Sequence, residues 1–147
     1  MAPAELGPDQ EAALRALVDV VLPRHAGLEA ASERGVHEHV AACLEAMQPG
    51  SVRMLILLLD IHARNVDSAA RFADLGPEGR ARVFSDLAVD DADEIRDAVD
   101  GVLLFTLGGY FSDWSGYDRA SRRLDAPPVW RRVGYRGPSE HHLPNAR

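Results

Sequence analysis

The stretch PDQEAALRALVDVVL, residues 8–22, contains the pattern on which the fold depends. Its apolar side chains recur at intervals of three and four residues, which is the spacing of one face of an α-helix. These side chains are Leu14, Leu17, Val18, Val21 and Leu22. Pro8 suits the first turn of such a helix, and Pro23 ends it because a residue that precedes proline is pushed out of the helical region. The sequence therefore begins with an amphipathic helix.

Four further segments show a helical pattern, and no segment shows the strict alternation of a half-buried strand. We predict N-caps at Ser32 and Ser51, a helix led by Pro77, and a helix that begins in the acidic run 90–94. The last of these is expected to break at Gly108-Gly109. The sequence thus predicts an all-α fold, a small bundle of about five or six helices, with an irregular C-terminal arm rich in aromatic and arginine residues.

Residues 51–61 are apolar on nearly all sides of the predicted helix. A helix of this kind belongs in the centre of a domain, so we expect it to be the most buried one. It should share one core with the helix that follows the acidic run. The residues predicted to be buried together are Leu55, Leu58, Leu59, Val99, Val102 and Leu103.

The composition excludes several classes of protein. The chain has 147 residues, 46% of them apolar, and a formal charge of −7, which fits one globular domain and disfavours nucleic-acid binding. All 16 basic residues are arginine, which excludes Schiff-base and other lysine chemistry. Cys43 is the single cysteine, and its place on an apolar stripe indicates a core thiol rather than a nucleophile. No signal-peptide or membrane-spanning pattern is present, so we expect a cytoplasmic location, with export alongside a partner left open.

The character of the chain changes near residue 108. Six of the nine aromatic residues lie within 110–135, and residues 119–147 carry a local charge of +5, which leaves −12 for the rest. We divide the chain into a helical core (1–107), an arm packed on the same single domain (108–138) and a mobile tail (139–147). Trp, Tyr and Arg are the residues most enriched at protein–protein hot spots. The predicted partner interface consists of Trp114, Tyr117, Trp130, Arg131, Arg132, Tyr135 and Arg136.

The alternative interpretation of the arm is that its aromatic side chains seal the core of the domain from outside. For Tyr110 and Phe111, which directly follow the last predicted core helix, the two interpretations stay equally open. For residues 130–135, where arginines lie between the aromatic residues, we favour partner contact.

No catalytic, cofactor-binding or metal-binding motif is recognisable in the sequence. His37 and His39 lie two residues apart, or about 200° around a helix axis, so they cannot share a metal ion and are expected on the surface. The acidic run lacks the glycine of an EF-hand loop, and no glycine-rich phosphate-binding turn is present. We therefore predict no catalytic residues, no bound cofactor and no metal in this chain.

Five short segments resemble the motifs of one family. They are Leu-Val-Asp-Val-Val-Leu-Pro at 17–23, Gly35-Val36, Leu-Gly-Pro-Glu-Gly-Arg at 75–80, and Gly-Tyr-Phe-Ser-Asp at 109–113 followed by Trp-Arg-Arg-Val-Gly-Tyr-Arg-Gly-Pro at 130–138. Together they are similar to the gluconate 2-dehydrogenase subunit 3 family. Trp114-Ser115-Gly116-Tyr117-Asp118 departs from the glycine-glycine-asparagine that the family has between its two aromatic motifs.

The resemblance implies a small helical subunit that associates with a large flavoprotein of the glucose-methanol-choline type. The partner would hold FAD and the catalytic histidine, and the small subunit would support its folding, cofactor loading or export. The first hypothesis is therefore a non-catalytic accessory subunit of an FAD-dependent alcohol or sugar oxidoreductase. Two alternatives remain: an independent small helical enzyme, for example in secondary metabolism, and a freestanding helical binding module.

Overall fold

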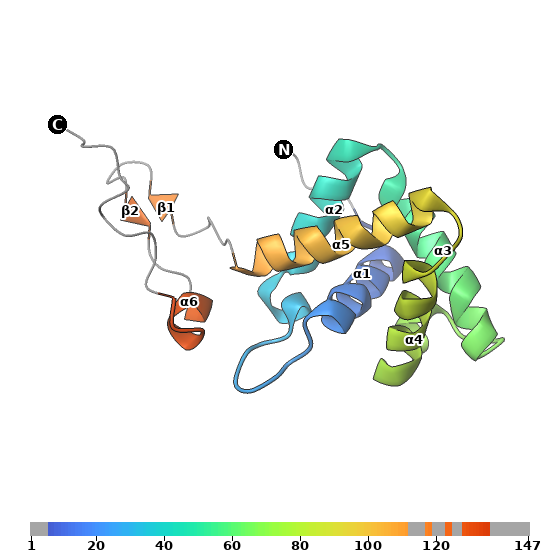
Figure 1. Cartoon of the computed structure of the whole chain (residues 1–147), viewed down its shortest axis with the longest axis horizontal. Helices are drawn as coiled ribbons and strands as arrows, with labels where there is room; N and C mark the ends of the chain where they lie inside the picture. Colours follow the sequence, from blue (N-terminus) through green and yellow to red (C-terminus); the bar gives the residue numbers. More distant parts are fainter. Residues whose placement is uncertain (1–5, 112–116, 119–122, 125–127, 136–147) are drawn as a thin grey trace. The chain divides into compact units, whose positions relative to one another are not determined.

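The computed structural model describes residues 6–111, 117–118, 123–124 and 128–135, and it confirms the all-α fold. The first five α-helices are α1 (Pro8–Val21), α2 (Val36–Met47), α3 (Ser51–Val66), α4 (Pro77–Ala88) and α5 (Asp93–Phe111). Two short 3₁₀ helices, η1 (Ala31–Arg34) and η2 (Phe72–Asp74), lie in the connections between them. The C-terminal part contains the short strands β1 (Tyr117–Asp118) and β2 (Arg123–Leu124) and the helix α6 (Pro128–Arg132), as Figure 1 shows.

The contacts divide the chain into two compact units, Met1–Tyr110 and Phe111–Arg147. The first unit contains the helical bundle. In the second, β1 and β2 pair antiparallel, with Tyr117 opposite Leu124 and Asp118 opposite Arg123. The segment that was expected to be irregular thus contains a short ladder and a helix.

Helix α1 is the centre of the first unit. It packs against α2, α3, α4, η1 and η2, and its Leu14, Leu17 and Val18 have no exposed surface. The prediction that the helix of residues 51–61 is the most buried one is wrong. Helix α3 lies at the periphery, where only one side of it is covered, and it leaves Met54 and Leu57 more than half exposed.

Four of the six residues predicted to form the core are buried, which confirms their burial but does not test whether α3 and α5 share one core. Leu55 and Leu59 of α3 and Val99 and Val102 of α5 are buried. Leu58 and Leu103 are only half-buried. Leu58 directly precedes buried Leu59 and Leu103 directly follows buried Val102, so each points about 100° away from its buried neighbour.

The two predicted serine caps are wrong. Near each serine, a carboxylate from another segment accepts backbone N–H groups instead. Ser32 lies in η1, where its N–H and its hydroxyl donate to the two carboxylate oxygens of Asp19 at 2.8 and 2.7 Å. Helix α2 begins instead after Gly35, which has a φ of +71°. At α3 the carboxylate of Glu45 accepts the N–H groups of Gly50 and Val52 at 2.8 and 3.0 Å.

Gly108-Gly109 does not break the last core helix, contrary to the prediction, and α5 continues to Phe111. The reason for glycine at 109 is a close approach of α2 and α5. A Cβ atom on Gly109 would lie 2.6 Å from Cδ2 of His39 and 3.3 Å from Cγ1 of Val36. At Gly108, by contrast, a Cβ atom would meet no heavy atom within 4 Å.

No single helix within the described part of the chain is long and apolar enough to cross a membrane. Helices α2 and α3 meet the length and composition limits only as a pair, and they are bent by 114° at their junction.

Candidate functional site

Helix α6 owes its sharp end to the sequence Trp-Arg-Arg-Val-Gly-Tyr at 130–135. Gly134 has a φ of +73°, a conformation that glycine adopts without steric cost. The N–H of Gly134 donates to the carbonyl of Arg131 at 3.3 Å, and the N–H of Tyr135 donates to the carbonyl of Trp130 at 2.8 Å. This pair of bonds is the Schellman motif, in which a left-handed residue closes the last turn of a helix.

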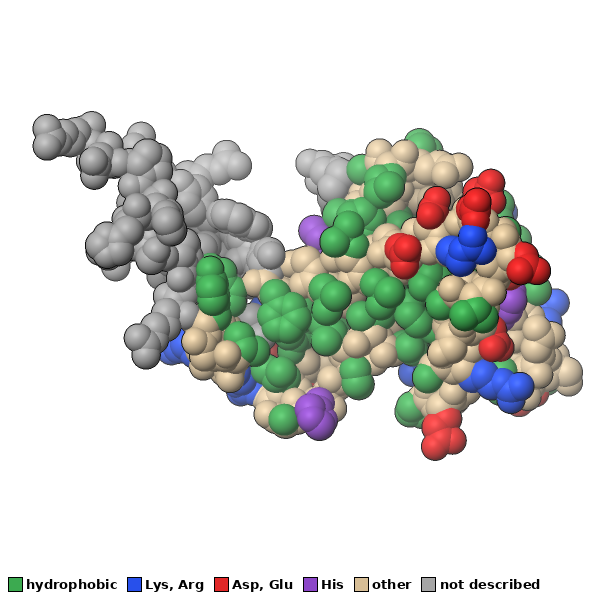
Figure 2. Space-filling view, viewed as in Figure 1, with side chains coloured by type: hydrophobic (Ala, Val, Ile, Leu, Met, Phe, Trp, Pro, Cys, Tyr) green, Lys and Arg blue, Asp and Glu red, His purple; other side chains and the backbone are tan. Residues whose placement is uncertain are grey.

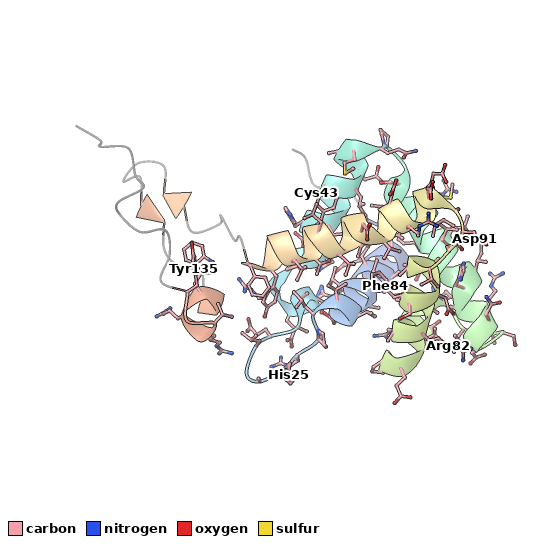
Figure 3. All side chains as sticks on the ribbon, in the orientation of Figure 1. His25, Cys43, Arg82, Phe84, Asp91 and Tyr135 are labelled. Atoms are coloured by element: carbon pink, nitrogen blue, oxygen red, sulfur yellow. The ribbon has the colours of Figure 1, made fainter. Side chains whose placement is uncertain are left out.

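The aromatic rings of Trp130 and Tyr135 complete that closure. Their centroids lie 4.9 Å apart with the planes at 84°, an edge-to-face contact of the kind that favours aromatic pairs, and Tyr135 lies close to α6 in Figure 3. Within the same unit, the indole N–H of Trp130 donates to the carbonyl of Phe111 at 2.7 Å. Trp130 is half-buried and has a structural role within this unit, whereas the sequence analysis favoured partner contact for it over closure of the core.

The rest of the motif faces solvent. Arg131 and Arg132 are exposed, and Val133 and Tyr135 each keep 50% of their surface accessible. None of the three remaining predicted interface residues can be placed by its side chain. Trp114 and Arg136 lie outside the described residues, and for Tyr117 only the backbone, in β1, is described. We use the name α6 surface for Arg131, Arg132, Val133 and Tyr135.

Tyr110 belongs to the core of the first unit. It is only 2% exposed, and its hydroxyl donates to the carbonyl of Glu29 at 2.7 Å. The guanidinium of Arg34 lies 4.6 Å from the centroid of its ring, within the range of a cation–π interaction. Of the two interpretations left open for this residue, core closure is the correct one.

His37 is buried, contrary to the prediction of a surface histidine, whereas His39 is exposed. Nε2 of His37 lies 3.4 Å from a guanidinium nitrogen of Arg15 and 3.7 Å from a carboxylate oxygen of Glu11. Burial, and secondarily the charge of Arg15, lower the pKa of His37. The period of α2 alone would have placed His37 beside buried Val40 and Ala41, a signal that the metal-spacing argument overlooked.

Cys43 lies one turn after His39 on α2, and its sulfur is 3.6 Å from Nε2 of that histidine. A thiol becomes a strong nucleophile when a neighbouring group lowers its pKa. Here burial raises the pKa of the Cys43 thiol. This direction is opposite to the shift that would activate the half-buried thiol.

Two of the open grooves among the described residues of the first unit are larger than a third, of about 130 Å³, between α1 and α3. One, of about 410 Å³, has apolar walls from α1 and α4 with Asp19, Arg24 and Arg80 at its edges. Both carboxylate oxygens of Asp19 already accept hydrogen bonds from Ser32, and Arg24 pairs with Glu33. The other, of about 300 Å³, lies between the end of α2, the start of α3 and the first turns of α5. Within the described ranges, no three His, Cys, Asp or Glu side chains are grouped so that they could hold a metal ion.

Comparison of the chain with protein-family models, with curated proteins and with solved structures finds no match in any of the three.

Proposed function

We propose that this chain is a non-catalytic accessory subunit that binds a large FAD-dependent alcohol or sugar oxidoreductase and supports its folding or activity. The α6 surface is the observation that carries the proposal. The resemblance of the quoted motifs to the gluconate 2-dehydrogenase subunit 3 family supplies the class of partner. FAD belongs to that partner, and this chain contributes no group to the chemistry.

The α6 surface has the composition of a hot spot on a locally rigid support. Tyr and Arg bring a large contact area and directional hydrogen bonds, and Val133 adds apolar surface between them. The Schellman closure and the Trp130–Tyr135 contact fix the backbone before binding. A surface ordered in advance loses less entropy on association, which favours affinity.

The charge of the α6 surface supports an acidic partner face. Arg131 and Arg132 are adjacent, exposed and part of a segment with a net charge of +5, whereas the rest of the chain carries −12. Opposite charge steers two proteins together and fixes their orientation more than it adds affinity. The arm should therefore be the part of this chain that meets an acidic face of the partner.

The test compares affinity with stability for the same variants. We expect Arg131→Glu with Arg132→Glu to weaken binding to the co-purified flavoprotein at least about tenfold, since two favourable charge pairs become repulsive. The melting temperature should stay unchanged because both side chains are exposed. The matched control is Arg53→Glu with Arg82→Glu, which makes the same change of charge at exposed positions of α3 and α4 and should leave binding intact.

Equal losses of affinity in the two charge-reversed pairs would refute the α6 surface as the interface, because the effect would then be one of net charge. Trp130→Ala is unsuitable as the first variant, since it also removes the hydrogen bond to Phe111 and the contact with Tyr135.

A further inference from the structure

We infer that the outward face of α5 is a second docking surface, and that its occupant is an amphipathic helix with apolar side chains on one half and arginine or lysine on the other. The inference deepens the proposed function, since it supposes a protein partner. The α5 stripe consists of Asp97, Asp100, Leu104 and Leu107.

The register of the stripe suits a second helix. Its members follow one another at intervals of three, four and three residues, which is the spacing of a seam between packed helices. All four are exposed, and Leu104 and Leu107 leave 66% and 42% of their surface accessible. The core side of α5, with Val99, Val102 and Thr106, lies on a different face. The stripe is therefore an apolar and acidic row that nothing in the first unit covers.

The two halves of the stripe differ in chemistry. Leu104 and Leu107 form the C-terminal half, and Asp97 and Asp100 form the N-terminal half. Neither carboxylate has an ion-pair partner among the described residues, whereas neighbouring Asp93 pairs with Arg96. Figure 2 shows hydrophobic side chains spread along the face over α5 and acidic side chains gathered towards its N-terminal end.

The groove of about 300 Å³ borders the acidic half of the stripe. Glu94, Asp97, Ala98 and Gly101 form its α5 wall, and Leu44, Met47, Gln48 and Ser51 form the opposite wall. Met47, which is 73% exposed, adds apolar surface at this edge. A long side chain with an apolar stem and a cationic end fits such a groove. Its stem would pack on Leu44 and Met47, and its charge would meet the carboxylates of Glu94 and Asp97.

The charge pattern argues against a second copy of this chain as the occupant. Two antiparallel α5 helices would set the carboxylates of one copy against the leucines of the other, which costs desolvation without compensation. Two parallel helices would set carboxylate against carboxylate. A helix with basic side chains opposite Asp97 and Asp100 pairs these carboxylates with opposite charge, and its apolar half covers the two leucines of the stripe.

The test uses the full chain and two synthetic helical peptides of about 18 residues, a length at which a helix is marginally stable alone. The first peptide carries leucine at the seam positions of one half and arginine at those of the other, and the second has glutamate in place of arginine. Fluorescence anisotropy should show that the wild-type chain binds the arginine peptide and not the glutamate peptide.

Three variants make the result specific. Asp97→Arg with Asp100→Arg should weaken binding of the arginine peptide at least about tenfold and create binding of the glutamate peptide. Leu104→Gln with Leu107→Gln should abolish binding of the arginine peptide. Glu29→Arg with Asp86→Arg makes the same change of charge at exposed sites on other segments. This control should leave the affinities for both peptides as in the wild type.

Three outcomes overturn the inference: no binding of the arginine peptide, equal binding of both peptides, or a wild-type dimer in light scattering that Leu104→Gln dissociates. The last would make the stripe a self-association surface. None of these measurements contains a flavoprotein, so their failure is distinct from failure of the proposed function.

Discussion

His37 is the residue whose chemistry the fold changes most clearly. Its ring is only 2% exposed, and its Nδ1 is buried with no hydrogen-bond partner among the described residues. Arg15 lies against Nε2, and a guanidinium can only donate, so this contact favours the neutral ring with its proton on Nδ1. Glu11, Asp19 and Glu38 favour the charged ring, but burial and Arg15 outweigh them and lower the pKa.

A lowered pKa in the folded state makes stability depend on pH. Between the folded pKa and the unfolded value of about 6.5, the unfolded chain binds more protons than the folded one. The stabilisation is therefore complete above about pH 6.5 and is lost as the pH falls towards the folded pKa, by at most about 1.4 kcal/mol per pH unit.

We expect urea unfolding of the wild type at pH 7.5 and pH 5.5, two values that bracket about 6.5, to show a larger loss of stability on acidification than unfolding of His37→Gln. His62→Gln, in a half-buried histidine on α3, is the control and should keep the wild-type dependence. If His37→Gln and the wild type lose equal amounts, His37 is not the group that titrates.

At the scale of elements, the close approach of α2 and α5 requires glycine at only one of the two adjacent positions 108 and 109. Gly109 lies where His39 and Val36 leave no room for a side chain, and Gly108 lies in open space on the same helix. In a helix interior, alanine stabilises the folded state relative to glycine by about 0.5–1 kcal/mol. The two glycines should therefore respond to alanine in opposite directions.

Gly108→Ala should raise the free energy of unfolding by about 0.5–1 kcal/mol, as helix propensity alone requires. Gly109→Ala should lower it by about 1–3 kcal/mol, because either the ring of His39 or the helix must shift to accept the new methyl group. Chemical denaturation of the two variants under one condition measures the contrast. A gain of stability in both would show that α2 and α5 do not approach closely at Gly109.

The elements also show how far the sequence could predict the fold. Helical period and proline or glycine punctuation sufficed for α1 to α4, because these signals are local. The degree of burial of α3 could not be predicted from the helical period. A helix that is apolar on all sides does not show in its sequence which side its neighbours cover. The capping groups Asp19 and Glu45 were missed because each acts on a different segment through tertiary contact.

At the scale of the whole molecule, the α6 surface contains residues that the sequence analysis named as an interface, but its local architecture was not predicted. The exposed positions of Arg131, Arg132 and Tyr135 agree with a solvent-facing motif, and the Gly134 turn was readable in principle from a glycine after a short helical run. The hydrogen bond from Trp130 to Phe111 joins residues far apart in sequence, so no local pattern indicates it. The α5 stripe was overlooked because its acids were attributed to the helix N-terminus alone.

The central claim is that this chain works as part of a flavoprotein complex. Its most direct test is the flavin content of the material that co-purifies with the affinity-tagged chain from its native cells. We expect a yellow complex with about one flavin per tagged chain, a colourless preparation when the same chain is expressed alone, and loss of the flavin with Arg131→Glu and Arg132→Glu. A native preparation without flavin, or FAD held in equal amount by the isolated chain, would contradict the account.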